Sequence, residues 1–287
     1  MTGLVFAIYS SFFLALAQGA LKKSYKELEP SSAFFLDMLF GILLWIPLSI
    51  FIGINLNNLG VVFVYAIISA ILSEAFYFFA LSKGQLSITS ILIGSYPVYT
   101  VIFSYFINQE RLSTLQLIFV LVTIFGTLIT YLPSKLKFSE LKKSGAILLP
   151  LIAAIGVGLS DTLSKGVINL TKDFSFLFAL ALVQIPVSLI YLKIEKQKPL
   201  LIVKEVVKKN HIYKNAVIGS LFNIIGTGLL WISFSKTLAS IASPVTATSG
   251  AIVVLLAIIF FDEKINLRSV VGLLLVFLGI IGISTQV

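Results

Sequence analysis

Long apolar stretches separated by short polar segments run through the whole chain. Each stretch is close to the roughly 20 residues that a helix needs to cross the hydrocarbon core of a bilayer. The backbone has no water partners there, so we interpret every stretch as a transmembrane helix. The predicted spans are residues 3–21, 31–53, 61–82, 86–107, 115–131, 145–165, 174–192, 215–234, 240–261 and 267–284. The pattern therefore predicts an all-α integral membrane protein with ten transmembrane helices.

The polar residues around the fourth and fifth predicted spans return around the ninth and tenth. The corresponding residues, at one constant offset along the chain, are Lys83 and Lys236, Ser87 and Ser240, Ser90 and Ser243, Glu110 and Glu263, and Gly126 and Gly279. Such a recurrence indicates a duplicated unit. We expect two five-helix repeats, 1–133 and 145–287, joined by a connector at 134–144. Because five is an odd number of crossings, the second repeat would be inverted relative to the first.

Composition supports a membrane protein. Hydrophobic residues make up 58% of the chain and charged residues 11%, whereas a soluble domain carries about 25% charged residues. The net charge of +9 need not indicate nucleic acid, because Lys and Arg collect in the cytoplasmic loops of membrane proteins. The chain has no cysteine, which excludes disulfides and thiolate metal sites. The first apolar stretch lacks a basic n-region and a small-residue cleavage site, so we expect a retained helix.

Short motifs stand out in the first half of the chain. They are Ala80-Leu81-Ser82-Lys83-Gly84-Gln85-Leu86-Ser87, Ser95-Tyr96-Pro97-Val98 and Gln109-Glu110-Arg111-Leu112, followed by an apolar span that contains Gly126. They resemble the repeat of the drug/metabolite transporter superfamily, and its ten-helix, EamA-type branch is the closest match. The resemblance implies two inverted EamA-like repeats, a substrate cavity between them near the middle of the membrane, and a fifth and tenth helix that pack together away from it. Three places depart from the family pattern, since Leu14-Ala15 replaces a frequent Trp-Gly, Asp37 a frequent arginine and Tyr96 a frequent acidic residue.

Three acidic residues lie inside predicted spans. An ionisable side chain in the membrane costs a few kcal/mol and is therefore a candidate functional group. Glu74 could bind a cationic group or carry a proton, or it could be a structural glutamate hydrogen-bonded to a Ser or Tyr on a neighbouring helix. Asp37, nearer to the membrane boundary, is the second candidate. Asp161 and Lys165 lie four residues apart on one helix face, so they form either a substrate clamp or a simple intrahelical pair.

Polar and aromatic residues in other spans complete the predicted binding site. Tyr96 and Tyr99 share one helix face beside Pro97 and could stack on a cationic or aromatic solute, or they could be packing groups. Trp231 lies near a helix end, where an interfacial anchor is the alternative. The predicted substrate-binding residues are Glu74, Tyr77, Tyr96, Tyr99, Asp37, Gln18, Asp161, Asn223, Trp231 and Ser249.

Two motif residues and one basic segment are expected to have structural roles. Glu110 and Glu263 each lie beside a basic residue at the end of a span, so they form a salt bridge or a cap on the next helix start. Residues 193–214 are predicted to be a long basic loop, which acts as a topology signal or contacts anionic lipid headgroups. His211 in this segment is expected to be solvated.

These features predict a secondary active transporter for small polar metabolites, such as amino acids, amines or similar cationic or zwitterionic solutes. It would work by alternating access around a cavity lined by the first, third, fourth, sixth, eighth and ninth spans, with proton coupling or exchange. A lipid or lipid-linked carrier flippase of the same fold is the alternative, and a non-transporting membrane scaffold is a third. An enzyme is not expected, because the sequence contains no phosphate-binding loop, metal-binding helix or nucleophile–base set. We expect no cofactor and no nucleic acid partner, contact with membrane lipid, a monomer or homodimer, and a multi-pass location in the cell membrane.

Overall fold

The computed structural model of the chain describes residues 1–55, 57–83, 92–131, 148–208, 211–253, 255 and 267–286. Within these residues every regular element is a helix, and no strand is present. Seven helices are long and apolar enough to cross a membrane, and three shorter apolar helices accompany them. The prediction of an all-α membrane protein is therefore confirmed. The count of ten spans stays a prediction, because parts of the fourth and ninth predicted spans lie outside the described residues.

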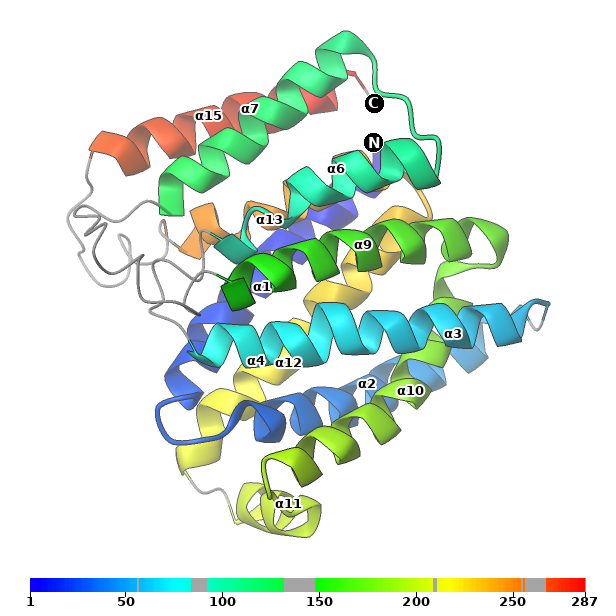
Figure 1. Cartoon of the computed structure of the whole chain (residues 1–287), viewed down its shortest axis with the longest axis vertical. Helices are drawn as coiled ribbons and strands as arrows, with labels where there is room; N and C mark the ends of the chain where they lie inside the picture. Colours follow the sequence, from blue (N-terminus) through cyan, green and yellow to red (C-terminus); the bar gives the residue numbers. More distant parts are fainter. Residues whose placement is uncertain are drawn as a thin grey trace.

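The helices follow the predicted apolar stretches closely (Figure 1). In chain order they are α1 (Thr2–Ser24), α2 (Pro30–Ile52), α3 (Leu59–Ser69), η1 (Ala70–Ala75), α4 (Phe76–Lys83), α6 (Tyr96–Ile107), α7 (Thr114–Tyr131), α9 (Leu148–Leu170), α10 (Asp173–Ile194), α11 (Pro199–Val207), α12 (His211–Phe234), α13 (Ala239–Ala247) and α15 (Leu267–Ser284). The third predicted span is continuous through α3, η1 and α4. Its middle segment η1 is a π-helix that contains Glu74, and such segments are rare and frequent at functional sites.

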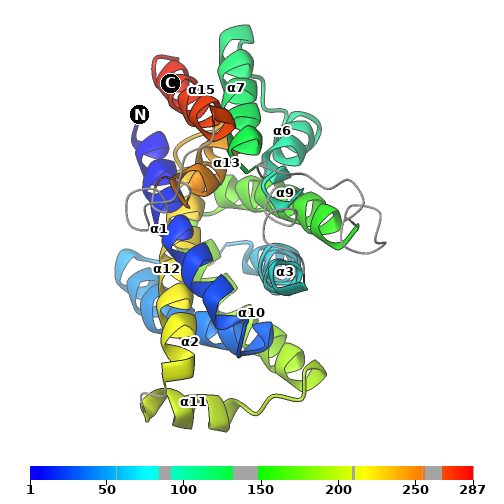
Figure 2. The same ribbon diagram turned by 90° about the vertical axis from the view of Figure 1, so that its left-hand side faces the viewer.

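The helices pack in pairs that join the two halves of the chain. α1 packs on α12, and α9 packs on α3 and η1. α2 packs on α10, α6 on α13, and α7 on α15. Both ends of the chain lie close together and far from α11 (Figures 1 and 2). Two halves related by a twofold axis would pack in such pairs. The arrangement supports the predicted division into inverted repeats, which remains a prediction.

Small residues and hydroxyl groups join the helices. A Cβ atom at Gly226 of α12 would lie 2.8 Å from a side chain of α1, and the Ser10 hydroxyl donates to the Gly226 carbonyl at 2.7 Å. Serines connect α3 to α9, since the Ser69 hydroxyl lies 2.7 Å from that of Ser164 and 2.9 Å from that of Ser160. In lipid there is little hydrophobic drive between helices, so close approach and hydrogen bonds hold them together.

Large apolar side chains cover the outside of the bundle. Phe51 is 89% exposed, and Phe106 and Phe277 are each 68% exposed. Monomeric soluble proteins rarely present apolar patches of this extent. On this protein they form the surface that contacts the acyl chains of the bilayer.

The segment between α10 and α12 differs from its predicted structure. The sequence predicts a long loop, but Pro199–Val207 forms the nine-residue helix α11. Proline suits the first turn of a helix because no backbone N–H is needed there, and Ile202 is buried against the bundle. His211, which was expected in the same loop, is the first residue of α12. The prediction was wrong because a search for membrane-length apolar stretches passes over a helix this short.

Candidate functional site

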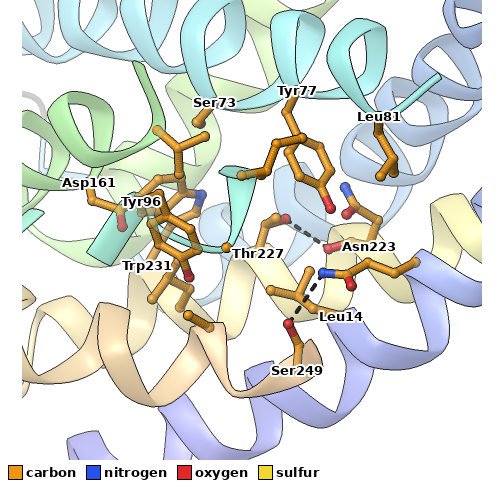
Figure 3. A pocket seen from close by; sticks show the side chains of 16 residues that line it. Leu14, Ser73, Tyr77, Leu81, Tyr96, Asp161, Asn223, Thr227, Trp231 and Ser249 are labelled. Carbon is orange, nitrogen blue, oxygen red and sulfur yellow. Dashed lines mark hydrogen bonds between the residues drawn. The ribbon is translucent and has the colours of Figure 1, made fainter. Parts of the chain in front are cut away.

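A cavity lies between the two halves of the chain (Figure 3). Its described lining comes from α1, η1, α4, α6, α9, α12, α13 and the residues that directly precede α6 or follow α13. These elements belong to the six spans that the sequence places around the substrate cavity. The volume inside it that is open to the centres of water molecules is about 80 Å³. This is enough for a few water molecules.

Seven of the ten predicted binding residues line this cavity. They are Gln18, Tyr77, Tyr96, Asp161, Asn223, Trp231 and Ser249. They come from five different helices and the residues after α13, so only the folded bundle brings them together. A hydrogen bond crosses the cavity from the Gln18 Nε2 atom on α1 to the Ser249 hydroxyl at 3.3 Å. That these side chains bind a solute stays a prediction.

Asp161 is the charged residue of the described lining. Its Oδ2 atom accepts hydrogen bonds from the Thr100 hydroxyl at 3.3 Å and from the Ser243 hydroxyl. Those donors lie on α6 and α13, so the carboxyl group of α9 connects three helices. Both bonds end on Oδ2, which leaves the Oδ1 atom as an acceptor for a ligand. The described lining contains no Lys, Arg or His, so Asp161 gives the described part of this cavity a negative character.

Trp231 is a cavity residue and not an interfacial anchor. Its side chain is 2% exposed, and its ring contacts those of Phe176 and Phe234 edge-on at 5.3 and 5.4 Å between centroids. The indole Nε1 atom has no hydrogen-bond partner among the described residues. A buried N–H group without an acceptor is uncommon. It is therefore a candidate donor to a bound solute.

Glu74 and Asp37 lie outside the cavity lining, in a cluster next to it. In the span that contains Glu74, the residues that face the cavity are Ser73, Tyr77 and Leu81, which are spaced four apart (Figure 3). Glu74, the residue after Ser73, lies on another face of the same helix. It is directed toward α10, where Gln184 Nε2 donates to its Oε2 atom. The Asp37 Oδ1 atom accepts a hydrogen bond from Asn223 Nδ2 at 3.0 Å. Both carboxyl groups are thus hydrogen-bonded to neighbouring helices; the structural interpretation of Glu74 expected a Ser or Tyr partner, and the partner observed is Gln184.

Two further expectations are not met in the described residues. Tyr99 does not line the cavity, because its Cβ atom lies against Gly158 of α9, where an added Cβ would be 2.6 Å away. Asp161 and Lys165 form no ion pair with each other: the Lys165 ammonium instead donates to the Phe234 carbonyl of α12.

Several lining residues were absent from the sequence prediction. They include Leu14, Ser73, Leu81, Val157 and Thr227. A helical spacing could have found some of them: Leu14 precedes Gln18 by four residues, and Thr227 follows Asn223 by four. The same spacing applies to the others, since Ser73 and Leu81 lie four residues on either side of Tyr77, and Val157 precedes Asp161 by four. No group of three or more metal-ligating side chains is present among the residues that the structure describes.

Comparison with known proteins agrees with this architecture. The model of the EamA-like transporter family matches residues 1–132 and again residues 144–285. The chain belongs to the EamA-like transporter family. This family is part of the drug/metabolite transporter superfamily, as the motifs had indicated. The protein is therefore a multi-pass integral membrane protein of the cell membrane and a membrane transporter.

Relatives in the EamA-like family share modest identity over most of the chain. An uncharacterized transporter of Clostridium kluyveri is 21% identical over 96% of this chain and 91% of its own length. An uncharacterized transporter of Archaeoglobus fulgidus is 26% identical over 91% of this chain and 90% of its own. An uncharacterized protein of Methanocaldococcus jannaschii is 31% identical over 48% of this chain but 96% of its own length. This relative corresponds to about half of this chain, which agrees with a chain built from two copies of one unit.

A crystal structure of another protein has the same fold. It aligns with a TM-score of 0.71 over 100% of this chain and 98% of the other, at 15% identity. At that identity the likeness concerns the fold alone. The chemistry of the cavity has to be argued from the residues of this chain.

Proposed function

We propose that this EamA-like protein is a secondary active transporter for small solutes that carry a cationic group, such as amines or amino acids. The observation that carries the proposal is the lining of the cavity. Asp161 is the charged side chain among its described residues, and no basic residue accompanies it. A carboxylate buried in a membrane is costly without a partner, so an ammonium group of the solute would supply the missing positive charge.

The remaining polar groups of the cavity suit a zwitterion better than a simple amine. The amides of Gln18 and Asn223 and the indole N–H of Trp231 are hydrogen-bond donors. A solute carboxylate would accept from such donors while its ammonium group contacts Asp161. The aromatic faces of Tyr77 and Tyr96 are suited to the apolar part or the cationic group of the same solute.

Alternating access gives a reason for the narrow cavity. The walls come from both halves of the chain, and the bond between Gln18 and Ser249 joins α1 to the residues that follow α13. Two halves that rock around a central site would break such contacts on one side and form them on the other. The cavity would then widen toward one face of the membrane at a time.

Thermal unfolding of the purified protein with added solutes tests the proposal. A ligand that binds only the folded state stabilises it by about 2.7 kcal/mol at 100 times its dissociation constant. Amino acids and amines should raise the unfolding midpoint, and anionic solutes of similar size should not. The Asp161→Asn variant should lose the effect, and Glu27→Gln, at an exposed turn residue, should keep it. Stabilisation by anions alone, or equal stabilisation of Asp161→Asn, would contradict a cation-selective site.

A flippase for amphiphiles is the second candidate, because a separate crevice opens on the outer surface between α4 and α10. Apolar side chains line it, among them Ile71, Phe76 and Ile190, together with Glu29 and Glu195. Such a crevice could hold an acyl chain beside a cationic headgroup. A lipid-scrambling assay in vesicles, run beside uptake of labelled amino acids, separates the two functions, since only a flippase moves labelled lipid between leaflets.

A further inference from the structure

Four polar side chains meet behind the wall of the cavity, where α2, η1, α10 and α12 pack together. They are Asp37, Glu74, Gln184 and Asn223, and none is more than 4% exposed. Gln184 Nε2 donates to Glu74 Oε2, and Asn223 Nδ2 donates to Asp37 Oδ1 at 3.0 Å. The Asp37 and Glu74 carboxyl groups are close enough to repel each other when both are ionised. The two acid–amide pairs therefore form one cluster.

The cluster has more acceptors than donors. The atoms Asp37 Oδ2, Glu74 Oε1 and Gln184 Oε1 are buried and have no hydrogen-bond partner among the described residues. The charged group that acts on Asp37 is Glu74, another acid. Tyr25, directly after α1, interacts electrostatically with Asp37, and the other groups that act on it are Tyr77 on α4, Tyr191 on α10 and the acid Glu195 after α10. Leaving three buried oxygens without donors is costly, and two ionised acids side by side are costlier still.

We propose that this cluster is a proton-binding site of the transporter, with Glu74 as the group that carries the proton. A proton on Glu74 Oε1 turns that atom into a donor, and the amide already bonded to Glu74 offers an acceptor without a described partner, Gln184 Oε1. A carboxylic acid and a primary amide would then exchange two hydrogen bonds in a ring. One proton thus removes two of the three unpartnered oxygens and one of the two negative charges. Asp37 keeps its charge and its bond to Asn223.

A proton fits the cluster better than a metal ion does. Asp37, Glu74 and Gln184 are absent from the lining of the central cavity, so no space for an ion is evident there. Hard cations take six or more oxygen ligands at full coordination, whereas three unpartnered oxygens are present in the described part of this cluster. A proton needs neither space nor additional ligands.

The site is connected to the cavity through Asn223. This side chain lines the cavity and also donates to Asp37. A solute that takes the Asn223 amide as its own donor would leave Asp37 without a partner and so favour transfer of a proton to it. This step of the inference rests on the proposed function, because it requires a solute that binds in the cavity. The cluster would then be the site at which a proton gradient acts on transport.

Difference infrared spectroscopy of the purified protein in lipid tests the site without any solute. At about pH 7, where a free glutamate is ionised, we expect the C=O band of a protonated carboxylic acid, and Glu74→Gln should remove it. Gln184→Leu should shift the band, because the acid loses its amide partner. The control Glu205→Gln, on α11, should leave the band unchanged.

Absence of the band from the wild type, or its persistence in Glu74→Gln, would overturn the proposal. A loss of the band on addition of sodium at the same pH would also overturn it and would indicate a metal-ion site. If Glu74→Gln does not fold, the shift in Gln184→Leu decides, because an unshifted band cannot belong to the acid–amide pair.

Proteoliposomes separate this inference from the proposed function. Uptake of a labelled amino-acid mixture should be accelerated by an inward proton gradient in the wild type. Glu74→Gln should lose that acceleration and retain exchange of labelled for unlabelled amino acids. A protein that shows the infrared band but transports no amino acid would contradict the proposed function alone. Unchanged acceleration in Glu74→Gln would contradict the role of Glu74 alone.

Discussion

Glu110 caps the first turn of α13 through Ser240, which lies 130 residues further along the chain. The Glu110 Oε2 atom accepts from the Ser240 backbone N–H at 2.9 Å and from the Ser240 hydroxyl. Its Oε1 atom accepts from the Ala239 N–H, also at 2.9 Å. A carboxylate is favourable there because the N–H groups of a first helical turn have no partner within the helix. The contact joins the end of α6 to the start of α13, and so connects the two halves.

The sequence expected Glu110 to form a salt bridge or to cap the next helix start. Glu110 does cap a helix. The capped helix, however, is α13 and not α7, which is the next helix in the chain. A distant partner could not be found from local spacing. Glu263, the repeat counterpart of Glu110, lies outside the described residues.

Replacing the cap should destabilise the protein. Glu110→Gln keeps the size of the side chain but removes its charge and one strong acceptor, and leaves a buried N–H without a partner. Hydrogen bonds to a charged group contribute about 1.5–3 kcal/mol each, so we expect a loss of about 1–3 kcal/mol in the free energy of unfolding. Thermal unfolding in detergent measures it. The exposed Glu27→Gln should change stability little, and an equal midpoint for both variants would exclude a capping role.

Close packing of α7 against α15 should depend on glycine. A Cβ atom at Gly279 would lie 2.9 Å from the backbone N of Thr123 and 3.0 Å from the carbonyl O of Phe119. Backbone atoms of a helix cannot move away from an added Cβ atom as a flexible side chain can, so Gly279→Ala should force α7 and α15 apart. Overpacking of this kind costs about 1–3 kcal/mol, which should lower the unfolding midpoint.

Gly60 provides the matched control for this substitution. It lies in α3, and a Cβ atom there would meet nothing within 4 Å. Gly60→Ala should be neutral or should stabilise by about 0.5–1 kcal/mol, since alanine favours a helix. If Gly279→Ala were as stable as Gly60→Ala, the two helices would not be held together by this contact.

The helices could be predicted because membrane spans depend on the length and hydrophobicity of a stretch. Residues 267–284 coincide with α15, and α1, α2, α7 and α10 begin and end within a few residues of their predicted bounds. α9 ends at Leu170, beyond its expected end near Lys165. The pairing of α7 with α15, which the family resemblance implied, is present as well.

The direction of individual side chains could not be predicted with the same success. Glu74 directly follows the cavity-lining Ser73, and both lie in the π-helix between α3 and α4. A hydropathy profile does not reveal a π-helical segment. Trp231 was similarly ambiguous, because distance from a helix end does not reveal whether Phe176 of another helix covers the ring.

Water should reach Ser73 but not Ser69, although both lie in the same span. Ser73 lines the cavity, whereas Ser69 is buried and contacts Ser160 and Ser164 of α9. The chain has no cysteine of its own, so a single introduced thiol can be followed without background. Because the thiolate is the reactive form and forms only where water is present, Ser73→Cys should react with a small charged thiosulfonate reagent much faster than Ser69→Cys. Equal rates would show that the cavity is closed to water or that α3 and α9 separate readily.

The helix α11 should lie on the membrane surface. Its exposed side presents Leu200, Val203 and Val207 beside Lys204 and Lys208. Apolar side chains next to lysines are typical of helices that insert one face at the level of anionic headgroups.

Fluorescence quenching by brominated lipids measures where this helix lies. The indole introduced by Leu200→Trp should be quenched, after subtraction of the parent protein with its buried Trp45 and Trp231. Replacing both lysines by glutamine should weaken the contact in anionic vesicles by about 1 kcal/mol per lysine, and so reduce the quenching. In vesicles of neutral lipid the lysine substitutions should have little effect. An introduced indole that is quenched by a water-soluble agent and not by the lipid would place α11 away from the bilayer.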